Sequence, residues 1–200
     1  MFLITEPNQK SIAQFIEQQC GDPFSYSEIG FSRNGNAPDG YNVDHNRIQI
    51  GTGGNDFRQA VKAIQNWKMF DLDWVKLYPN TTPIEIGETV AIAIKHFGFW
   101  SLNAARIVYV FEETDTDIEK YGFAYGTLTE HGERGEERFS VEFHKKDESV
   151  WYDLYAFSQP KHLLAKIGYP FSRMLQKQFA AESKQAMKNA IPDSRFQIKL

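Results

Sequence analysis

The stretch of sequence that decides the fold runs from Tyr121 to Phe157 and reads YGFAYGTLTEHGERGEERFSVEFHKKDESVWYDLYAF. It contains three strand candidates rich in aromatic residues, joined by two polar turns. In the first candidate, small residues (Gly122, Ala124 and Gly126) alternate with aromatic ones, so one face of the sheet is nearly bare and the other is covered by rings. We expect the bare face to leave room either for a closely packed helix or for a ligand.

The first of the two turns is the most distinctive part of this stretch. Residues 131–138 are rich in glycine and charge, and we expect them to form a turn between two strands. His131 lies there beside Glu137, so the turn could hold an acid/base pair. A solvated connection with local ion pairs is the alternative reading.

Outward from this stretch, periodicity predicts the other elements. Helical spacing of apolar residues predicts helices over residues 8–20, 56–69 (with Asn55 or Asp56 as N-cap), 160–167 and from 171 to about 190. Short apolar or alternating runs predict strands over residues 47–51, 74–78, 89–97 and 105–112. Strands therefore follow one another from residue 74 to 157 at hairpin-like intervals, which favours consecutive antiparallel pairing.

This order predicts an α+β fold, because runs of strands bracketed by helices do not form parallel βαβ units. We expect a curved antiparallel sheet of about seven strands that grips a long C-terminal helix, with an extra N-terminal helix. No repeat or linker is visible, so residues 1–200 are expected to form one domain. Its parts would be an N-terminal helical extension (1–22), a body (23–192) and a tail (193–200).

Composition excludes several classes of function. The 200 residues carry a net charge of -4, which argues against a general nucleic-acid-binding protein. Cys20 is the only cysteine, so no intrachain disulfide can form and a reducing compartment is expected. The sequence shows no secretory signal and no apolar run of roughly 20 residues, the length of a membrane span. A cytoplasmic protein is the resulting expectation.

The order of elements resembles the helix-grip fold of the START, polyketide-cyclase and birch-pollen-allergen superfamily. This resemblance implies a cavity between sheet and helix that holds an apolar ligand. At the level of sequence, five runs are distinctive: RIQIGTGGNDFRQAVKAIQNW, ARIVYVFEE, GFAYGTLTEHGERGEERFSVE, VWYDLYAFSQP and GYPFSRMLQKQFAAESKQAM. Through these runs the chain is similar to the DUF1990 family over about residues 24–187. The family has no established activity, so the similarity implies none.

Three functions remain open from the sequence. The first is binding of a small apolar or lipid-like molecule, without a cofactor, by residues expected to line the cavity: Arg106, Tyr109, Phe123, Tyr125, Trp151 and Tyr155. The second is a cyclase-type or hydrolase-type enzyme that uses His131, Glu137 or Asp153 for proton transfer. The third is a structural or protein-interaction module with a filled core, in which the same aromatic residues are simply core.

The charged residues and the histidines do not decide between these three functions. Arg106, Glu137 and Asp153 could meet across neighbouring strands inside a cavity, or could form pairs on the surface. The five histidines lie in different elements without the spacing of a metal site, so we expect no metal. The run GTGG at residues 51–54 fits a structural turn better than a phosphate-binding loop. The sequence leaves the oligomeric state open.

Overall fold

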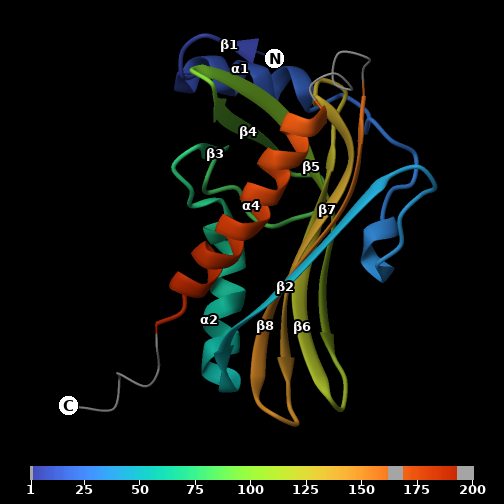
Figure 1. The fold of residues 1–200 in the computed structure, drawn as a ribbon, viewed down its shortest axis with the longest axis vertical. Helices are drawn as coiled ribbons and strands as arrows, with labels where there is room; N and C mark the ends of the chain where they lie inside the picture. Colours follow the sequence, from blue (N-terminus) through green and yellow to red (C-terminus); the bar gives the residue numbers. More distant parts are fainter. Residues whose placement is uncertain (1, 162–168, 193–200) are drawn as a thin grey trace.

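The computed structural model describes residues 2–161 and 169–192 (Figure 1). One antiparallel sheet runs through the fold, with the strand order β2-β8-β7-β6-β5-β4-β3, and β1 pairs with β5 beside this path. The strands are β1 (Phe2–Leu3), β2 (Asn42–Thr52), β3 (Val75–Tyr78), β4 (Thr89–His96), β5 (Phe99–Thr114), β6 (Ile118–Thr127), β7 (Glu133–His144) and β8 (Ser149–Pro160). The expected meander of six strands from β3 to β8 is confirmed, and β2 extends it by pairing with β8.

Two helices cover one face of the sheet, which we call the helix face. They are α2 (Gly53–Gln65) and α4 (Tyr169–Asn189), and α4 crosses the curved strands diagonally (Figure 1). The apolar side chains of α4 join the main core, together with the short 3-10 helix η2 (Lys68–Phe70). The expected arrangement, in which a curved sheet grips a long C-terminal helix, is confirmed.

The opposite face, which we call the outer face, carries the N-terminal helix at one end. Helix α1 (Gln9–Gln19) begins at Asn8, whose side chain accepts a hydrogen bond of 2.9 Å from the Ser11 amide. Its apolar stripe packs on β4 and β5, where Ile12 and Phe15 form a cluster with Leu102. The expected N-terminal helix is thus confirmed, and burial of this stripe against the sheet stabilises it.

The role expected for the small residues of β6 is wrong. Tyr121, Phe123 and Tyr125 point toward α2 and α4 and form part of the main core, so α4 packs against rings rather than against the bare face. Gly122, Ala124 and Gly126 lie on the outer face, where residues 24–41 cover part of the sheet. A Cβ at Gly126 would collide with the Tyr26 ring, and one at Gly122 would collide with Phe111 and with the neighbouring strand. The bare face therefore receives a loop and side chains of the sheet, not a helix.

The turn expected over residues 131–138 is also misplaced. Strand β7 already begins at Glu133, so the turn ends there and most of this charged run is strand. Gly135 explains the misreading: its φ of +151° and its close approach to the Phe157 carbonyl oxygen need a glycine inside a strand. The charges of this run alternate between the two faces of the sheet instead of facing solvent together.

Two smaller differences concern helix boundaries. Helix α2 begins three residues earlier than expected, with Thr52 as N-cap, and Asp56 instead accepts a hydrogen bond of 2.9 Å from the Thr52 amide. Pro160 ends β8, and the remainder of the helical segment expected over 160–167 lies outside the described residues apart from Lys161, as does the tail 193–200. Within the described ranges, no helix is long and apolar enough to cross a membrane.

Candidate functional site

A carboxyl group and a phenol lie together on the helix face of the sheet. Glu137 in β7 is the direct cross-strand partner of Tyr125 in β6, whose hydroxyl donates a hydrogen bond of 2.5 Å to the Glu137 carboxylate. Burial raises the pKa of Glu137 to about 7, and the negative charges of Asp44 and Glu133 act in the same direction. No basic side chain among the described residues forms an ion pair with Glu137. This carboxyl group therefore changes charge near neutral pH.

The first half of α4 contacts the sheet near Glu137 through polar side chains. Arg173 forms a two-pronged ion pair with Asp44 of β2. Ser172 donates a hydrogen bond of 3.0 Å to Glu133 of β7, and Gln176 also bonds to that carboxylate. Burial raises the pKa of Glu133, although the bonds from Ser172 and Gln176 partly oppose this effect. We call these residues, together with Glu137, the α4 polar contact.

The second half of α4 is held differently. Phe179, Ala180 and Met187 belong to the main apolar core or pack against it, as does Ile191 just after the end of the helix. Polar contacts accompany this packing: Tyr152 and Ser183 form a hydrogen bond of 2.8 Å, Trp74 donates one of 2.6 Å to Glu182, and Lys184 donates one of 3.2 Å to Asn46. The two halves of α4 thus differ, because apolar packing in the core holds the second half, whereas Ser172, Arg173 and Gln176 hold the first through polar contacts.

Two hollows on the described part of the protein lie away from α4. One, of about 330 Å³, lies beside the start of α1 and is lined in part by Asn8 and Phe15. The other, of about 480 Å³, lies on the outer face between residues 24–41, the start of β7 and the end of β8. Tyr26, Tyr41 and Arg134 line part of it, and neither hollow is lined by residues of α4.

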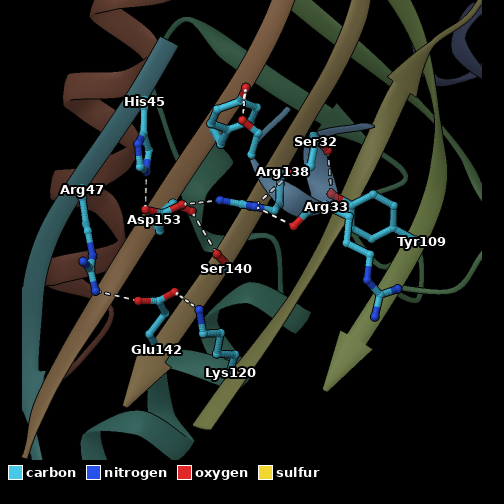
Figure 2. A network of polar contacts seen from close by, with 12 residues as sticks. Ser32, Arg33, His45, Arg47, Tyr109, Lys120, Arg138, Ser140, Glu142 and Asp153 are labelled. Carbon is cyan, nitrogen blue, oxygen red and sulfur yellow. Dashed lines mark hydrogen bonds and ion pairs between the residues drawn. The ribbon is translucent and has the colours of Figure 1, made fainter. Parts of the chain in front are cut away.

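The outer face carries a separate network centred on Asp153 (Figure 2). This carboxylate accepts a hydrogen bond of 2.9 Å from Arg138 and lies 2.6 Å from Nε2 of His45. Arg138 also donates to the backbone carbonyls of Ser32 and Arg33, at 2.8 and 3.1 Å. The side chain of Asp153 is 6% exposed, whereas that of His45 is 54% exposed. The network therefore fastens the loop to the sheet and presents one oriented imidazole to solvent.

Glu136 adds a second anchor for the same loop. Its buried carboxylate accepts hydrogen bonds of 2.7 Å from the Tyr26 hydroxyl, 2.8 Å from the Gly30 amide and 3.0 Å from the Ser32 amide. The Ser32 hydroxyl also bonds to this carboxylate and lies 2.5 Å from the Tyr109 hydroxyl. Donors thus surround the charge, as a buried carboxylate requires. Burial and the Glu136 charge raise the pKa of Tyr26, so its phenol stays protonated.

Further along the same face, Glu142 joins two basic residues. It lies 2.6 Å from Arg47 and 2.8 Å from Lys120 (Figure 2). The Arg47 guanidinium also lies over the ring of Trp151 at 4.7 Å. These contacts tie the edge strand β2 to the middle of the sheet, and the basic neighbours hold the pKa of Glu142 below its usual value despite its burial.

The structure divides the predicted ligand-binding residues between two faces. Phe123 and Tyr125 lie on the helix face within the main core. Three others, Tyr109, Trp151 and Tyr155, lie on the outer face. Arg106 donates hydrogen bonds to the carbonyls of Gln19, Cys20 and Asp22 after the end of α1. The six residues therefore do not line one common pocket.

The three predicted acid/base residues are also apart. Glu137 lies on the helix face and Asp153 on the outer face, while His131 lies in the turn before β7. The ring of His131 accepts a hydrogen bond of 3.1 Å from the Glu133 amide, and burial lowers its pKa to about 4. Because Arg106 is also engaged elsewhere, the cluster of Arg106, Glu137 and Asp153 considered from the sequence does not form.

Sequence reasoning missed the residues that pair most closely. His45, Glu136 and Ser32 were not singled out, because strand register and the path of residues 24–41 decide which side chains meet. The only signal in the sequence was the bare face at Gly122, Ala124 and Gly126, which indicates that something packs there. Among the described residues, no group of three or more histidine, cysteine, aspartate or glutamate side chains could hold a metal ion.

Comparison with known proteins gives a consistent result. Residues 25–186 match the family described as "Domain of unknown function (DUF1990)". A UPF0548 protein of Dictyostelium discoideum is 37% identical, with 96% of each chain covered. In fold, the chain is similar to a hypothetical protein of Helicobacter pylori, with a TM-score of 0.50 at 12% identity, covering 84% of this chain and 99% of that one.

A START superfamily protein of Mycobacterium smegmatis is a further structural neighbour. Its TM-score is 0.49 at 9% identity, and the match covers 76% of this chain and 97% of that one. Identities this low concern the fold alone. The family match is different in kind, because it extends over most of the chain and agrees with the relative's full-length similarity. The protein therefore belongs to the DUF1990 family.

Proposed function

We propose that the protein binds a small, mainly apolar molecule between the first turns of α4 and the sheet, at the α4 polar contact, with Glu137 contacting the polar end of the ligand. The observation that carries this proposal is the environment of the buried Glu137 carboxyl group. Its carboxyl group has a tyrosine as hydrogen-bond donor, lies close to two other acidic groups, and has no ion-pair partner among the described residues. A ligand group that donates a hydrogen bond would satisfy it.

The two halves of α4 support the same location. The apolar half is fixed by the core, so moving it would expose large apolar side chains. The polar half is held by Arg173 and Gln176, whose bonds to the sheet can be exchanged for bonds to a ligand or to water at little net free energy. A ligand would therefore enter at the first turns of α4, with its apolar body against the rings of Tyr125 and its neighbours. The single cysteine supports placing this activity in the cytoplasm.

Native mass spectrometry of the protein purified from its own cytosol tests the proposal. We expect a small molecule to co-purify with the wild-type chain and to be lost from a Glu137→Gln variant. Glu142→Gln is the matched control, because Glu142 lies in the same strand on the other face of the sheet. Two results together would contradict the proposal. The wild-type mass would show no bound molecule, and the NMR amide signals of β7 and α4 would not change when apolar small molecules are added. These results would favour an interaction module with a filled core.

The same pair of residues favours a second candidate, an enzyme that transfers protons. A carboxyl group with a pKa of about 7 is suited to general acid/base catalysis near neutral pH. Glu137 alone would carry this role, since Asp153 and His131 lie elsewhere. Once the co-purifying molecule is known, its conversion by wild-type protein but not by Glu137→Gln supports the enzyme, and release of the unchanged molecule supports simple binding.

A further inference from the structure

Several large apolar side chains are exposed to solvent at one end of the molecule. Ile4 is 80% exposed, Phe97 77%, Phe99 50% and Met174 51%. They come from the end of β1, from the hairpin between β4 and β5, and from the first turns of α4. Together with Phe171 they form what we call the end patch. Exposed apolar groups in one contiguous area mark an interaction surface, whereas scattered ones need no explanation.

Pairing and ring contacts bring these segments together. Leu3 pairs with Trp100, so the next residue, Ile4, continues this register toward Phe99. The rings of Phe97 and Phe171 lie 4.6 Å apart, centre to centre. Met174 follows Phe171 by one helical turn on α4. Figure 1 shows β1 and the first turn of α4 at the same end of the molecule.

The backbone at Phe97 is a second, independent observation. His96 and Phe99 pair directly, so Phe97 and Gly98 form a two-residue hairpin loop in which φ is +48° and +81°. Loops of this kind favour asparagine or glycine at the first position, because a positive φ is unfavourable for other residues. A phenylalanine there neither suits the turn nor fills the core. Such a local conflict is expected where a side chain serves a function.

The two segments that carry the phenylalanines and Met174 of the end patch contain basic but no acidic residues, although the chain as a whole carries a net charge of -4. No acidic residue occurs between Glu88 and Glu112, nor in residues 169–181. Lys95 and Lys177 are exposed in these two segments. Glu6, the acidic residue nearest to Ile4 in the chain, is paired with Lys76 at 2.5 Å.

We propose that the end patch docks on the surface of an anionic lipid bilayer. The rings of Phe97 and Phe99 enter the headgroup region, which aromatic side chains favour, and Lys95 and Lys177 contact anionic headgroups. A second copy of the chain fits less well as the occupant, because a symmetric contact would bring the lysines of the two copies together. This inference is independent of ligand binding at the α4 polar contact.

Co-sedimentation of the full chain with vesicles tests this inference. One set of vesicles contains phosphatidylcholine alone, and the other contains phosphatidylcholine with about one third phosphatidylserine. We expect measurable partitioning onto the anionic vesicles only. Phe97→Asn combined with Phe99→Ser should weaken it about tenfold or more, since each buried ring contributes substantially. Lys95→Glu and Lys177→Glu should each weaken it about fivefold or more.

Ile86→Ser is the matched control for this experiment. Ile86 is 69% exposed but lies just before the start of β4, at the other end of that strand from Phe97. This variant should partition like the wild type, and circular dichroism should show every variant folded. The proposal is overturned if the wild type does not bind vesicles or binds both kinds equally. It is also overturned if the wild type forms a dimer that Phe97→Asn disperses, while vesicle binding is absent.

Discussion

Glu136 and Glu137 are consecutive residues of β7, and their carboxylates lie on opposite faces of the sheet. Glu136 accepts a hydrogen bond of 2.7 Å from Tyr26 on the outer face, and Glu137 accepts one of 2.5 Å from Tyr125 on the helix face. The first carboxylate is surrounded by donors and anchors a loop. The second has one hydrogen-bond donor among the described residues, Tyr125, and acidic neighbours, so the same residue type serves structure on one face and is available for function on the other.

We expect Glu137→Gln to stabilise the protein above neutral pH. The pKa of Glu137 is raised from 4.5 to about 7 on folding, so the ionised form costs free energy in the folded state. This cost is absent below about pH 4.5, grows between pH 4.5 and 7, and reaches about 3 kcal/mol above pH 7 as an order of magnitude. Urea unfolding at pH 5 and pH 8 should show the gain at pH 8 only.

Glu142→Gln should have the opposite sign in the same experiment. Its pKa is lowered in the folded state, so ionised Glu142 stabilises the fold at pH 8, and that stabilisation is lost as the pH falls below its usual pKa. Equal effects of the two substitutions at pH 8 would mean that the environment of Glu137 is not as described.

Gly126→Ala should destabilise the protein by about 1–3 kcal/mol, because the new methyl group collides with the Tyr26 ring in a packed interface. Gly132→Ala is the control, since nothing lies within 4 Å of a Cβ at that position. Thermal and urea unfolding of both variants measure the difference. If Gly126→Ala is as stable as Gly132→Ala, the loop does not pack closely on the bare face.

Asp153→Asn should cost about 3–5 kcal/mol, because it leaves Arg138 buried without its counter-charge. Nε of Arg138 already has no hydrogen-bond partner, so the guanidinium depends on Asp153 and on the loop carbonyls. Glu113→Gln provides the comparison. It breaks the exposed pair with Arg33, which contributes about 0–1 kcal/mol. Similar losses from the two substitutions would contradict the central role of Asp153.

His131 should make the protein sensitive to mild acid. Burial lowers its pKa from 6.5 to about 4 in the folded state, so the unfolded chain takes up a proton first as the pH falls. Stability attributable to neutral His131 is complete above about pH 6.5 and is lost progressively toward pH 4. His131→Asn keeps an acceptor for the Glu133 amide and should remove this dependence. Unfolding of both proteins at pH 7 and pH 5 gives the difference, and a difference that does not change with pH would contradict the prediction.

The sequence predicted the architecture well because that architecture depends on local patterns. Alternation in residues 121–157 predicts three strands, helical spacing after residue 171 predicts the last helix, and the short connections between strands favour antiparallel pairing. The pattern could not say which face of β6 meets α4. That choice depends on the path of residues 24–41, a segment without regular periodicity that packs Tyr26 over Gly126 through contacts about a hundred residues apart in the chain.

The candidate site was harder to predict for a related reason. Glu137 was identified, but its partner depends on register, and one residue of slip would exchange the roles of Glu136 and Glu137. Gly135 hid the start of β7, because a Gly-rich, charged run is typical of turns. His45 lies outside the strand predicted over residues 47–51. It contacts Asp153 because β2 is longer than predicted and pairs with β8 over its whole length.

Phe97→Asn should stabilise the fold while weakening attachment to anionic vesicles. Asparagine tolerates the positive φ at this position, so replacing phenylalanine relieves a backbone cost of about 1 kcal/mol. The lost ring contact with Phe171 offsets part of this gain, because that contact is partly exposed. Phe99→Ser, in contrast, changes a strand residue with ordinary backbone angles and should not raise the melting temperature. A Phe97→Asn variant that is more stable and still binds vesicles like the wild type would show that the aromatic ring has no part in docking.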